Sequence, residues 1–422
     1  MSKNIFKTTK IIKESRLSPF LVCFLGASFV LYQFLIQGST SLMVPELMHS
    51  LCLNLTEIGF LSSAFFYPYI LLQIPSGYLI DKFGARTILL ISTLLLSLAS
   101  LAFSMCDCYS SANITRFLMG AASAPGVACA MSLAARWYPK KFTIVAAMIE
   151  MMGMVGGAIG DYALSYSTVH YGWRESMLLC SISGAILCIL IYLLVYNQPS
   201  NSINKQSSKE KVNKSSLGRI LMSLKIWKSC IYGGAMFSII SAFASLWSIP
   251  FLTSIYQDAT AHTISKATSL VFIGASIGTL LSAYLANRLS IKLIQIIFSI
   301  LATISFAIIL FYPLSLLKMM ILLFFLGVFS GSYILPFSSV EKQVPIHAKG
   351  IAMGFTNMII IGLGGPILQP LIGWIINHIQ EKDQILTCQL MQNMGTYQVA
   401  LLPILMCLII AIFLSILKNG FK

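Results

Sequence analysis

Twelve long apolar stretches, separated by short polar segments, constrain this chain more than any other feature. A run of about 20 apolar residues is long enough to cross the hydrocarbon core of a bilayer as a helix. The sequence is 57% hydrophobic and 10% charged, whereas soluble domains carry about 25% charged residues. These observations exclude an ordinary soluble protein and predict an all-α polytopic membrane protein with 12 transmembrane helices. The stretches cover approximately residues 19–44, 58–80, 87–106, 114–138, 142–164, 177–196, 231–253, 264–286, 291–312, 319–340, 350–376 and 397–417.

The basic residues are distributed unevenly over the predicted loops. The chain has 28 lysines and arginines against 13 acidic residues, which gives a net charge of +15. With the N-terminus inside, the basic residues on the outer side are Arg116, Arg174, Lys266, Lys318 and Lys382, and all others are inner. The positive-inside rule therefore predicts that both termini are cytoplasmic. The excess charge indicates topology and contact with anionic lipid, and we expect no nucleic-acid partner.

A polar segment divides the chain. Residues 197–218 are rich in serine, asparagine and lysine and lack apolar periodicity, which is typical of a linker without fixed structure. We therefore predict an N-terminal six-helix bundle at 1–196, a cytoplasmic linker at 197–218 and a C-terminal six-helix bundle at 219–422.

The two bundles share a weak internal repeat at an offset of about 206 residues. Residues 77–86 align with residues 283–292, so that Asp81 matches Asn287 and Lys82 matches Arg288. Six helices per copy give both copies the same orientation in the membrane. Parallel halves around a central axis are the plan on which one large class of secondary transporters builds a site near the bilayer midplane.

The first copy of this repeat resembles the loop signature of the major facilitator superfamily, Gly-x-x-x-Asp-Arg/Lys-x-Gly-x-Arg/Lys. The matching residues are Gly77, Asp81, Lys82, Gly84 and Arg86, in the expected loop between the second and third helices. The resemblance implies two pseudo-symmetric six-helix bundles and a transporter of the bacterial inner membrane that is not an enzyme. We expect a monomer without cofactor or metal, whose partners are a small-molecule solute and H⁺.

Two longer stretches narrow this resemblance. Residues 65–75, and a pattern that runs from Arg116-Phe-Leu-Met-Gly120 through Trp137 to Arg174, are similar to a bacterial branch that includes phagosomal transporters of amino acids and nucleosides. That branch is in turn similar to lysosomal dipeptide carriers. The resemblance implies nutrient uptake.

The charged loop at 77–86 is predicted to act as a conformational latch. A carboxylate at Asp81 can cap a neighbouring helix N-terminus or pair with the cations beside it, and such contacts can stabilise one conformation and release it. Asn287 and Arg288 would form a second latch, which is weaker because Asn287 has no charge. Alternatively, the loop is a solvated turn whose charges only set the topology.

Two carboxylates lie inside the fifth apolar stretch, where an ionisable side chain is costly and indicates function. Glu150 lies about eight residues into this stretch, near the middle of the bilayer, and Asp161 follows eleven residues later on the same helix face. We predict that both couple transport to protons, with Glu150 facing a central cavity. The alternative is a structural hydrogen bond from Glu150 to a neighbouring helix.

Arg116 is predicted to lie about as far toward the outer face as Asp161, because the fourth and fifth helices are antiparallel and joined by a tight turn at 139–141. The two side chains are expected to pair. The pair is either an outer gate or a static bridge between the two helices. A guanidinium also suits a substrate carboxylate, so Arg116 is a candidate substrate-binding residue.

Uncharged polar residues inside the apolar stretches are the other candidates for substrate binding. Gln33 and Gln37 share one face of the first helix, and Tyr69 and Gln73 share one face of the second. Amides and phenols suit a polar solute that is uncharged or zwitterionic. A second group has the alternative role of satisfying proline kinks or packing between helices. It consists of Trp247, Tyr333, Asn357 and Gln369.

The glycine pattern and the lack of a phosphate-binding loop disfavour a nucleotide site. Gly153, Gly156, Gly157 and Gly160 lie in an apolar segment that no strand precedes, so they indicate close helix packing, expected against the other half, and not a nucleotide site. The sequence has no phosphate-binding loop, so ATP is not expected to drive transport.

The ten cysteines show no spacing typical of a metal site. Cys52, Cys106, Cys108 and Cys388 fall near the predicted outer face, where one disulfide is conceivable. Free thiols in or near the membrane are the simpler interpretation.

The sequence favours a secondary active transporter that takes up a small polar organic nutrient with protons. An amino acid or short peptide is the first candidate, and a nucleoside is a further one. The alternative is a proton-antiport exporter of a drug, siderophore or metabolite. The antiporters of the superfamily carry a Gly-Pro pair in the fifth helix, whereas this chain has no proline there. A sensor or scaffold without transport activity is the least favoured interpretation.

Overall fold

The computed structural model describes residues 17–138, 142–196, 223–341, 343, 349–386 and 394–417, and the regular structure in these segments is helical. The turn at 139–141, the linker at 197–218, Cys388 and the Asp81 side chain lie outside the described part. Before the linker, the helices are α2 (Leu17–Leu42), α3 (Val44–Leu51), α4 (Leu55–Ser63), α5 (Phe66–Leu71), α6 (Gln73–Phe83), α7 (Ala85–Ser104), α8 (Tyr109–Ser123), α9 (Gly126–Trp137), α10 (Phe142–Tyr171) and α11 (Trp173–Leu194). After it, they are α13 (Leu224–Ser238), the π-helix η2 (Ile239–Trp247), α14 (Ser248–Ile255), α15 (Ala261–Leu285), α16 (Ile291–Phe311), α17 (Leu316–Ser330), the 3-10 helix η3 (Gly331–Ile334), α18 (Leu335–Glu341), α19 (Lys349–Leu363), the π-helix η5 (Gly364–Leu368), α20 (Gln369–Leu386), α21 (Met394–Ala400) and α22 (Leu402–Ile416).

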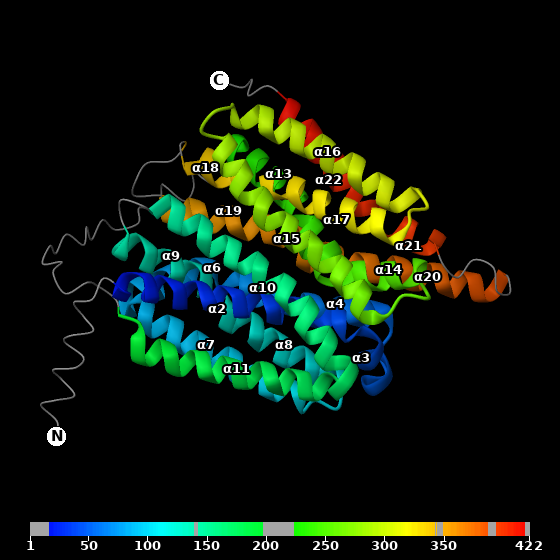
Figure 1. The fold of residues 1–422 in the computed structure, drawn as a ribbon, viewed down its shortest axis with the longest axis horizontal. Coiled ribbons are helices and arrows are strands. Elements are labelled where there is room, and N and C mark those ends of the chain that lie inside the picture. Colours follow the sequence, from blue (N-terminus) through cyan, green and yellow to red (C-terminus); the bar gives the residue numbers. More distant parts are fainter. Residues whose placement is uncertain are drawn as a thin grey trace, which may run out of the picture.

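Ten helical runs in the described part are long and apolar enough to cross a membrane. Two more runs, α10 and the α4–α6 segment, lie among them (Figure 1). The α4–α6 segment is interrupted near Ala64 and at Leu72. The expected multi-pass, all-α membrane protein is confirmed, and the count of twelve spans stays a prediction.

The helices gather in two groups (Figure 1). Those before the linker occupy one half of the molecule and those after it occupy the other, and α10 lies beside α15 at the boundary. The other extensive contact between the halves is made by α4, which packs along α20. We call these two contacts, α10 with α15 and α4 with α20, the seams.

Prolines mark the points at which the spanning helices break. Pro68 and Pro75 follow the two interruptions of the α4–α6 segment, and Pro125 lies between α8 and α9. Pro250 and Pro336 lie in the first turns of α14 and α18, directly after η2 and η3. Proline has no N–H and its ring collides with the carbonyl four residues earlier, so a helix ends or kinks near it. Membrane helices tolerate such breaks where other protein groups satisfy the freed backbone.

Side chains satisfy the backbone at these breaks. Pro370 has no N–H to donate to the Pro366 carbonyl, and the Tyr67 hydroxyl of the other half donates to it at 3.2 Å. The Gln369 amide donates to the Ser241 carbonyl in η2 at 2.7 Å, and the Trp247 indole donates to the Gln369 carbonyl at 3.1 Å. In this structure, the side chains of Gln369 and Trp247 therefore hydrogen-bond to backbone carbonyls of the interrupted helices.

Glycines bring the backbones of neighbouring helices into contact. Gly274 and Gly278 of α15 lie against the backbone of α17, and Gly327 of α17 lies against the backbone of α15. A Cβ at any of these positions would collide with a carbonyl oxygen of the partner. Small residues at such contacts are the usual way in which membrane helices gain packing energy, since lipid supplies no hydrophobic driving force.

The glycine face of α10 corrects the expectation that it packs against the other half. Gly156 lies against the Leu31 backbone of α2, and Gly153 and Gly160 face α2 as well, which belongs to the same half. Gly157 alone among these four glycines contacts the other half, through the Phe272 ring of α15. The reason is helical geometry, because steps of about 100° per residue place positions 153, 156 and 160 on one side and 157 beside it.

The two halves are bonded to each other at one end of the molecule, where α4 begins. The Asn377 amide of α20 donates to the Asn54 side chain at 3.1 Å and to the Thr56 hydroxyl at 2.6 Å. Thr56 in turn donates to the Gly373 carbonyl at 3.5 Å. The charge distribution predicts that this end is outer. The structure is therefore closed at the predicted outer end.

Gly278→Ala is expected to lower the midpoint of thermal unfolding, because its methyl group would meet the Val328 backbone and overpacking typically costs about 1–3 kcal/mol. Gly354→Ala is the matched control, since Gly354 faces open space and alanine is the better helix former by about 1 kcal/mol. Thermal unfolding of the purified proteins in one detergent measures the difference. Equal midpoints for both variants would contradict the close contact of α15 with α17.

Asn377→Ala is expected to open the predicted outer end, because it removes two hydrogen bonds between the halves, each with a net value of about 0.5–1.5 kcal/mol. The ratio of open to closed molecules should rise about tenfold, which corresponds to about 1.4 kcal/mol. Electron–electron distances between spin labels on Cys52 and Gln257→Cys, with Cys108 and Cys388 replaced by serine, report the opening. Ser183→Ala is the control, since that hydroxyl donates only within α11. An unchanged distance distribution in Asn377→Ala would show that these bonds do not keep the end closed.

Candidate functional site

Six of the candidate side chains meet between the two halves. They come from six different elements: Gln33 of α2, Tyr69 of α5, Gln73 of α6, Glu150 of α10, Tyr333 of η3 and Asn357 of α19. The Tyr69 phenol lies close enough to interact with Gln33, Gln73, Asn357 and Glu150. Glu150 also lies near the Tyr333 hydroxyl, without a hydrogen bond between them. We call these six residues the central cluster.

Several polar atoms of the central cluster are buried without a hydrogen-bond partner. They are both amide atoms of Gln33, the amide nitrogen of Gln73 and the hydroxyl of Tyr333. A buried polar group that stays unpaired costs about 1–3 kcal/mol, so native proteins rarely leave several together. Their convergence at one place indicates a site whose polar groups are available to a ligand or to water.

Helix breaks bring the cluster together. Tyr69 lies in the short helix α5 between two interruptions, Gln73 begins the next helix, and Tyr333 lies in the 3-10 turn between α17 and α18. Irregular backbone at membrane depth occurs where it lines a cavity or is buried in protein. The breaks therefore direct side chains of three spanning segments toward the interface of the halves.

Glu150 is the acidic member of the cluster. Its side chain is partly exposed, unlike the fully buried Gln33 and the nearly buried Tyr69, so it borders accessible space. Its surroundings are phenols and amides, and no basic side chain of the described segments lies within ion-pair distance. A carboxyl group in such a place can carry a proton or accept a hydrogen bond from a solute.

Thr279 of α15 belongs to the same region, where it lies near the Tyr333 hydroxyl. The candidates chosen from the sequence did not include it. Its position one residue after Gly278, on a helix otherwise rich in small and apolar residues, could have indicated it.

Arg116 does not pair with Asp161 in this structure, which corrects the expectation. Its guanidinium is fully buried and donates to the carbonyls of Ile36 at 3.0 Å and Gln37 at 3.2 Å, near the C-terminal end of α2. It also lies 5.2 Å from the centre of the Phe65 ring. Hydrogen bonds to carbonyl oxygens and the face of an aromatic ring both stabilise a cation, so neutral groups hold the Arg116 guanidinium in this structure.

Asp161 lies apart from the central cluster. The residue is 2% exposed, and its Oδ2 atom has no hydrogen-bond partner. Gln37 is also outside the cluster, with a 7% exposed residue surface and a backbone carbonyl that accepts from Arg116. A proton-coupling role for Asp161 stays a prediction.

The loop signature makes contacts within its own half. The Arg86 guanidinium, at the start of α7, donates to the Tyr192 carbonyl at the end of α11 at 2.7 Å. In the second copy, the Lys292 ammonium at the start of α16 donates to the Ile416 carbonyl at the end of α22 at 2.9 Å. In both halves a cation thus caps the C-terminus of the last helix, which is favourable because of the helix dipole.

The other residues of the signature are near the surface. Gly84 has a positive φ of 84°, which glycine adopts without strain, at the junction of α6 and α7. Lys82 and Arg288 lie over aromatic rings of their own segments, and Asn287 donates to the Ala283 carbonyl at 3.4 Å. Gly77 faces open space. A latch between the halves stays a prediction.

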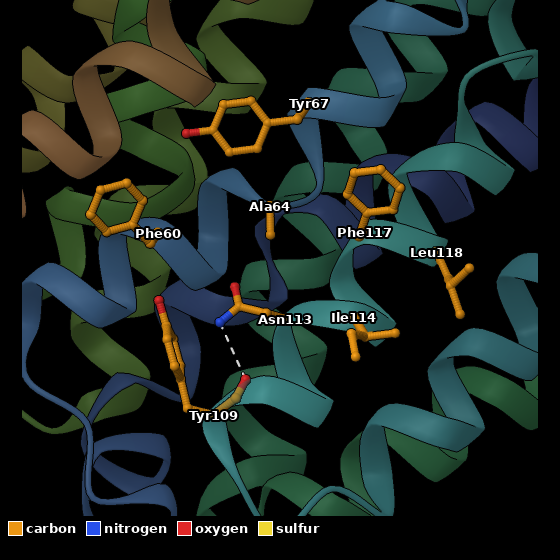
Figure 2. A pocket seen from close by; sticks show the side chains of 8 residues that line it. All are labelled: Phe60, Ala64, Tyr67, Tyr109, Asn113, Ile114, Phe117 and Leu118. Carbon is orange, nitrogen blue, oxygen red and sulfur yellow. Dashed lines mark hydrogen bonds between the residues drawn. The ribbon is translucent and has the colours of Figure 1, made fainter.

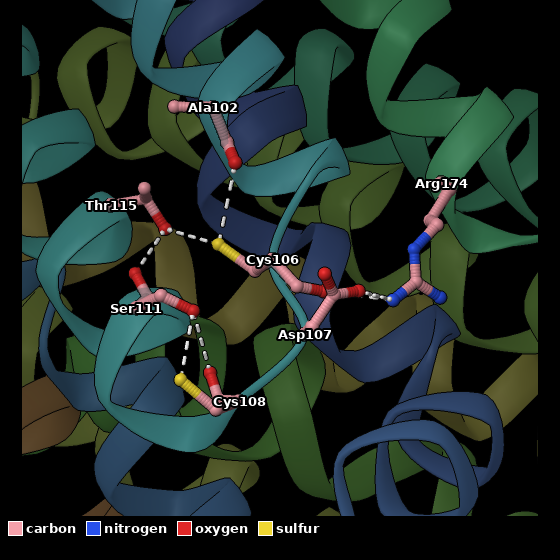
Figure 3. A network of polar contacts seen from close by, with 7 residues as sticks. All are labelled: Ala102, Cys106, Asp107, Cys108, Ser111, Thr115 and Arg174. Carbon is pink, nitrogen blue, oxygen red and sulfur yellow. Dashed lines mark hydrogen bonds and ion pairs between the residues drawn. The ribbon is translucent and has the colours of Figure 1, made fainter.

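The connection from α7 to α8 at the predicted outer end carries a polar network (Figure 3). Arg174 forms an ion pair with Asp107 at 2.8 Å, the one ion pair that the described residues contain, and also donates to the Cys106 carbonyl. Cys108 is exposed, and its sulfur lies 3.3 Å from the Ser111 hydroxyl. The Ser111 hydroxyl, followed by the Ser111 backbone, lowers the pKa of the Cys108 thiol from its usual value, against the opposing effect of Asp107.

The cysteines do not form a disulfide among the described residues. All nine that the structure describes are free, and Cys388 lies outside that part. In the same segments no three of the His, Cys, Asp and Glu side chains are grouped closely enough to bind a metal ion.

Comparison with known proteins relates the chain to membrane transporters. Residues 23–368 match the sequence model of the Major Facilitator Superfamily. The probable galactarate/D-glucarate transporter GarP of Escherichia coli strain K12 is 26% identical over 168 residues, which are 38% of this chain and 38% of that protein. The aligned region thus covers less than half of the length of this relative.

Two solved structures share the fold over nearly the whole chain. A bacterial homologue of the human lysosomal transporter Spinster, in an inward-facing and occupied conformation, has a TM-score of 0.77 at 12% identity and covers 95% of this chain and 97% of its own. A D-xylose-proton symporter has a TM-score of 0.72 at 14% identity and covers 94% and 97%.

Cys108 is expected to react with a membrane-impermeant maleimide at lower pH than free cysteine, because its thiol pKa is lowered and the thiolate is the reactive form. The rate is measured against pH in a background with Cys52 and Cys388 replaced by serine. Ser111→Ala should move the midpoint of the profile upward, and Ser110→Ala should not, since its hydroxyl has no part in the contact. The interpretation fails if Ser111→Ala and Ser110→Ala give the same profile.

Proposed function

Because the chain belongs to the major facilitator superfamily, we propose that it is a secondary active transporter that takes up a small polar organic nutrient together with protons. It works by alternating access, in which the two halves rock around the central cluster. We further propose that it lies in a bacterial inner membrane with both termini in the cytoplasm, as the charge distribution predicts.

The observation that carries this proposal is the central cluster itself. It lies between the halves, it draws on both of them, and several of its buried amide and hydroxyl atoms have no hydrogen-bond partner in this structure. A site at the interface of two such halves is alternately reached from each side when they rock. A structural polar network would instead be fully hydrogen-bonded, since unpaired buried groups destabilise a fold.

The chemistry of the cluster favours a solute with several hydrogen-bonding groups. Gln33, Gln73 and Asn357 supply both donors and acceptors, and the two tyrosines add hydroxyl groups and flat apolar faces. An amino acid or a short peptide is our first candidate, and a nucleoside is the next. The sugar acids named for GarP belong in the same test, because they are also small, polar and rich in hydroxyl groups.

Glu150 is the proposed site of proton coupling. A carboxylate that crosses the membrane region while charged is costly, whereas the protonated form is neutral. In the outward-open state, proton and solute bind together, and their joint occupancy favours closure of the outer end. Such coupling requires that the two states differ in their affinity for the pair. The closed outer end in this structure corresponds to the state from which both would leave toward the cytoplasm.

The substrate is tested by uptake into proteoliposomes. Radiolabelled amino acids, dipeptides, nucleosides and sugar acids are offered with and without an inward-directed proton gradient. Gradient-stimulated accumulation of one class is the expected result. Efflux of a lipophilic dye, driven by the reversed gradient and without accumulation of any nutrient, would instead identify a proton-antiport exporter.

Glu150→Gln is expected to abolish the stimulation by the gradient while leaving solute exchange between two equally loaded sides intact, because glutamine resembles the protonated carboxyl group. Glu175→Gln, at an exposed position in the first turn of α11, is the matched control and should behave as the unaltered protein. Tyr69→Phe should raise the KM, since it removes one hydroxyl from the cluster. Full, uncoupler-sensitive accumulation by Glu150→Gln would contradict the assignment of proton coupling to Glu150.

A further inference from the structure

A groove of about 390 Å³ opens on the outside of the first half, between the α4–α5 run and α8 (Figure 2). Its walls are formed by Phe60, Ala64 and Tyr67 on one side and by Tyr109, Asn113 and Phe117 on the other. Each set follows the spacing of three or four residues that places side chains on one side of a helix. The hollow lies over Ala64, whose methyl group is the smallest side chain in either wall.

The groove lies at membrane depth and faces the bilayer. α8 is part of the candidate span that covers residues 109–137. Ile114 beside the groove is 61% exposed and Phe117 is 45% exposed, which is expected for apolar side chains that face lipid. The groove ends where Gly120 lies against the Phe65 backbone, because α8 and α5 touch there.

We propose that the groove binds one acyl chain of a phospholipid from the leaflet at the predicted outer end. An unfilled groove in hydrocarbon would leave its wall atoms without dispersion contacts, and a flexible apolar chain can restore these contacts. The mostly apolar walls disfavour a polar solute. The bilayer supplies phospholipid chains at this depth in large excess over any other apolar molecule.

The end of the groove near the start of α8 is polar enough to receive a lipid ester group. The Asn113 amide donates one of its hydrogens to the Tyr109 carbonyl at 3.2 Å and has a second to offer (Figure 2). Tyrosine is enriched at the membrane–water interface, where its ring is apolar and its hydroxyl is hydrated. An acyl chain over Ala64 thus places its ester carbonyl near Asn113.

Occupation of the groove affects the closed outer end through Tyr67. The ring of Tyr67 is part of the wall, while its hydroxyl donates to the Pro366 carbonyl of the other half at 3.2 Å. A chain packed behind this ring stabilises the position from which the hydrogen bond is made. The bound lipid therefore stabilises the closed state, independently of which solute is transported.

The test uses the full-length protein in vesicles that contain a phospholipid with a photoreactive diazirine midway along one acyl chain. After irradiation, mass spectrometry locates the label. We expect several-fold more label on the exposed Phe117 and Leu118 than on the similarly exposed Ile182 and Ile186 of α11. Ala64→Leu, which fills the hollow, should remove this excess. Ala185→Leu, at an exposed position of α11, is the matched control and should leave it unchanged.

Three outcomes overturn the proposal. Equal labelling of the groove and of α11 would mean that the groove contacts only bulk lipid. Labelling by a diazirine fatty acid, but not by the phospholipid, would identify a single-chain amphiphile as the occupant. Excess labelling that persists in Ala64→Leu would place the chain elsewhere on α8. Should Ala64→Leu fail to fold, Ile114→Trp narrows the same groove from the lipid side and is expected to have the same effect on the label.

Discussion

The absence of water from the bilayer interior is the constraint on which the rest of this structure depends. Every backbone group that a proline frees must find a partner within the protein. Tyr67 meets this demand at the carbonyl that Pro370 frees, and Gln369 and Trp247 bond to further backbone carbonyls in η2 and α20. The same prolines that interrupt the helices thereby fix how the helices pack, and the interruptions turn polar side chains toward the interface of the halves. The central cluster is a product of this arrangement.

The contacts between the halves differ in chemistry from the contacts within each half. At the predicted outer end, the halves are joined by neutral groups, namely two asparagines, a threonine and backbone carbonyls. Neutral hydrogen bonds have small net energies, so a few of them can close an interface and still be exchanged for water when it opens. Within each half, by contrast, glycines allow backbone contact and a cation caps the last helix. Each half is thus more firmly joined within itself than to the other half.

The sequence predicts most of the fold and about half of the site. Apolar stretches and the repeat at 77–86 indicate the spans and the two halves, because the bilayer enforces the length of each helix. Polar residues in apolar segments indicate the central cluster, because such residues avoid lipid. The partners of Arg116 could not be predicted, since its long side chain reaches carbonyls of α2 whose positions depend on helix packing. The hydrogen bonds of Asn54 were not predicted either, although the pattern Asn54-Leu-Thr-Glu57 is a recognisable capping box.

Helix α10 is joined to α2 by glycines whose backbones touch, and to α15 through side chains such as Phe272. Backbone contacts of the first kind do not slide, so α10 moves as part of its own half. Glu150 and Asp161 are eleven residues apart on this helix, a separation of about 16 Å along its axis. This separation is the same in every state of a helix that stays intact. Neither carboxyl group can therefore approach the other during transport, and any proton exchanged between them must be carried by water or by the solute.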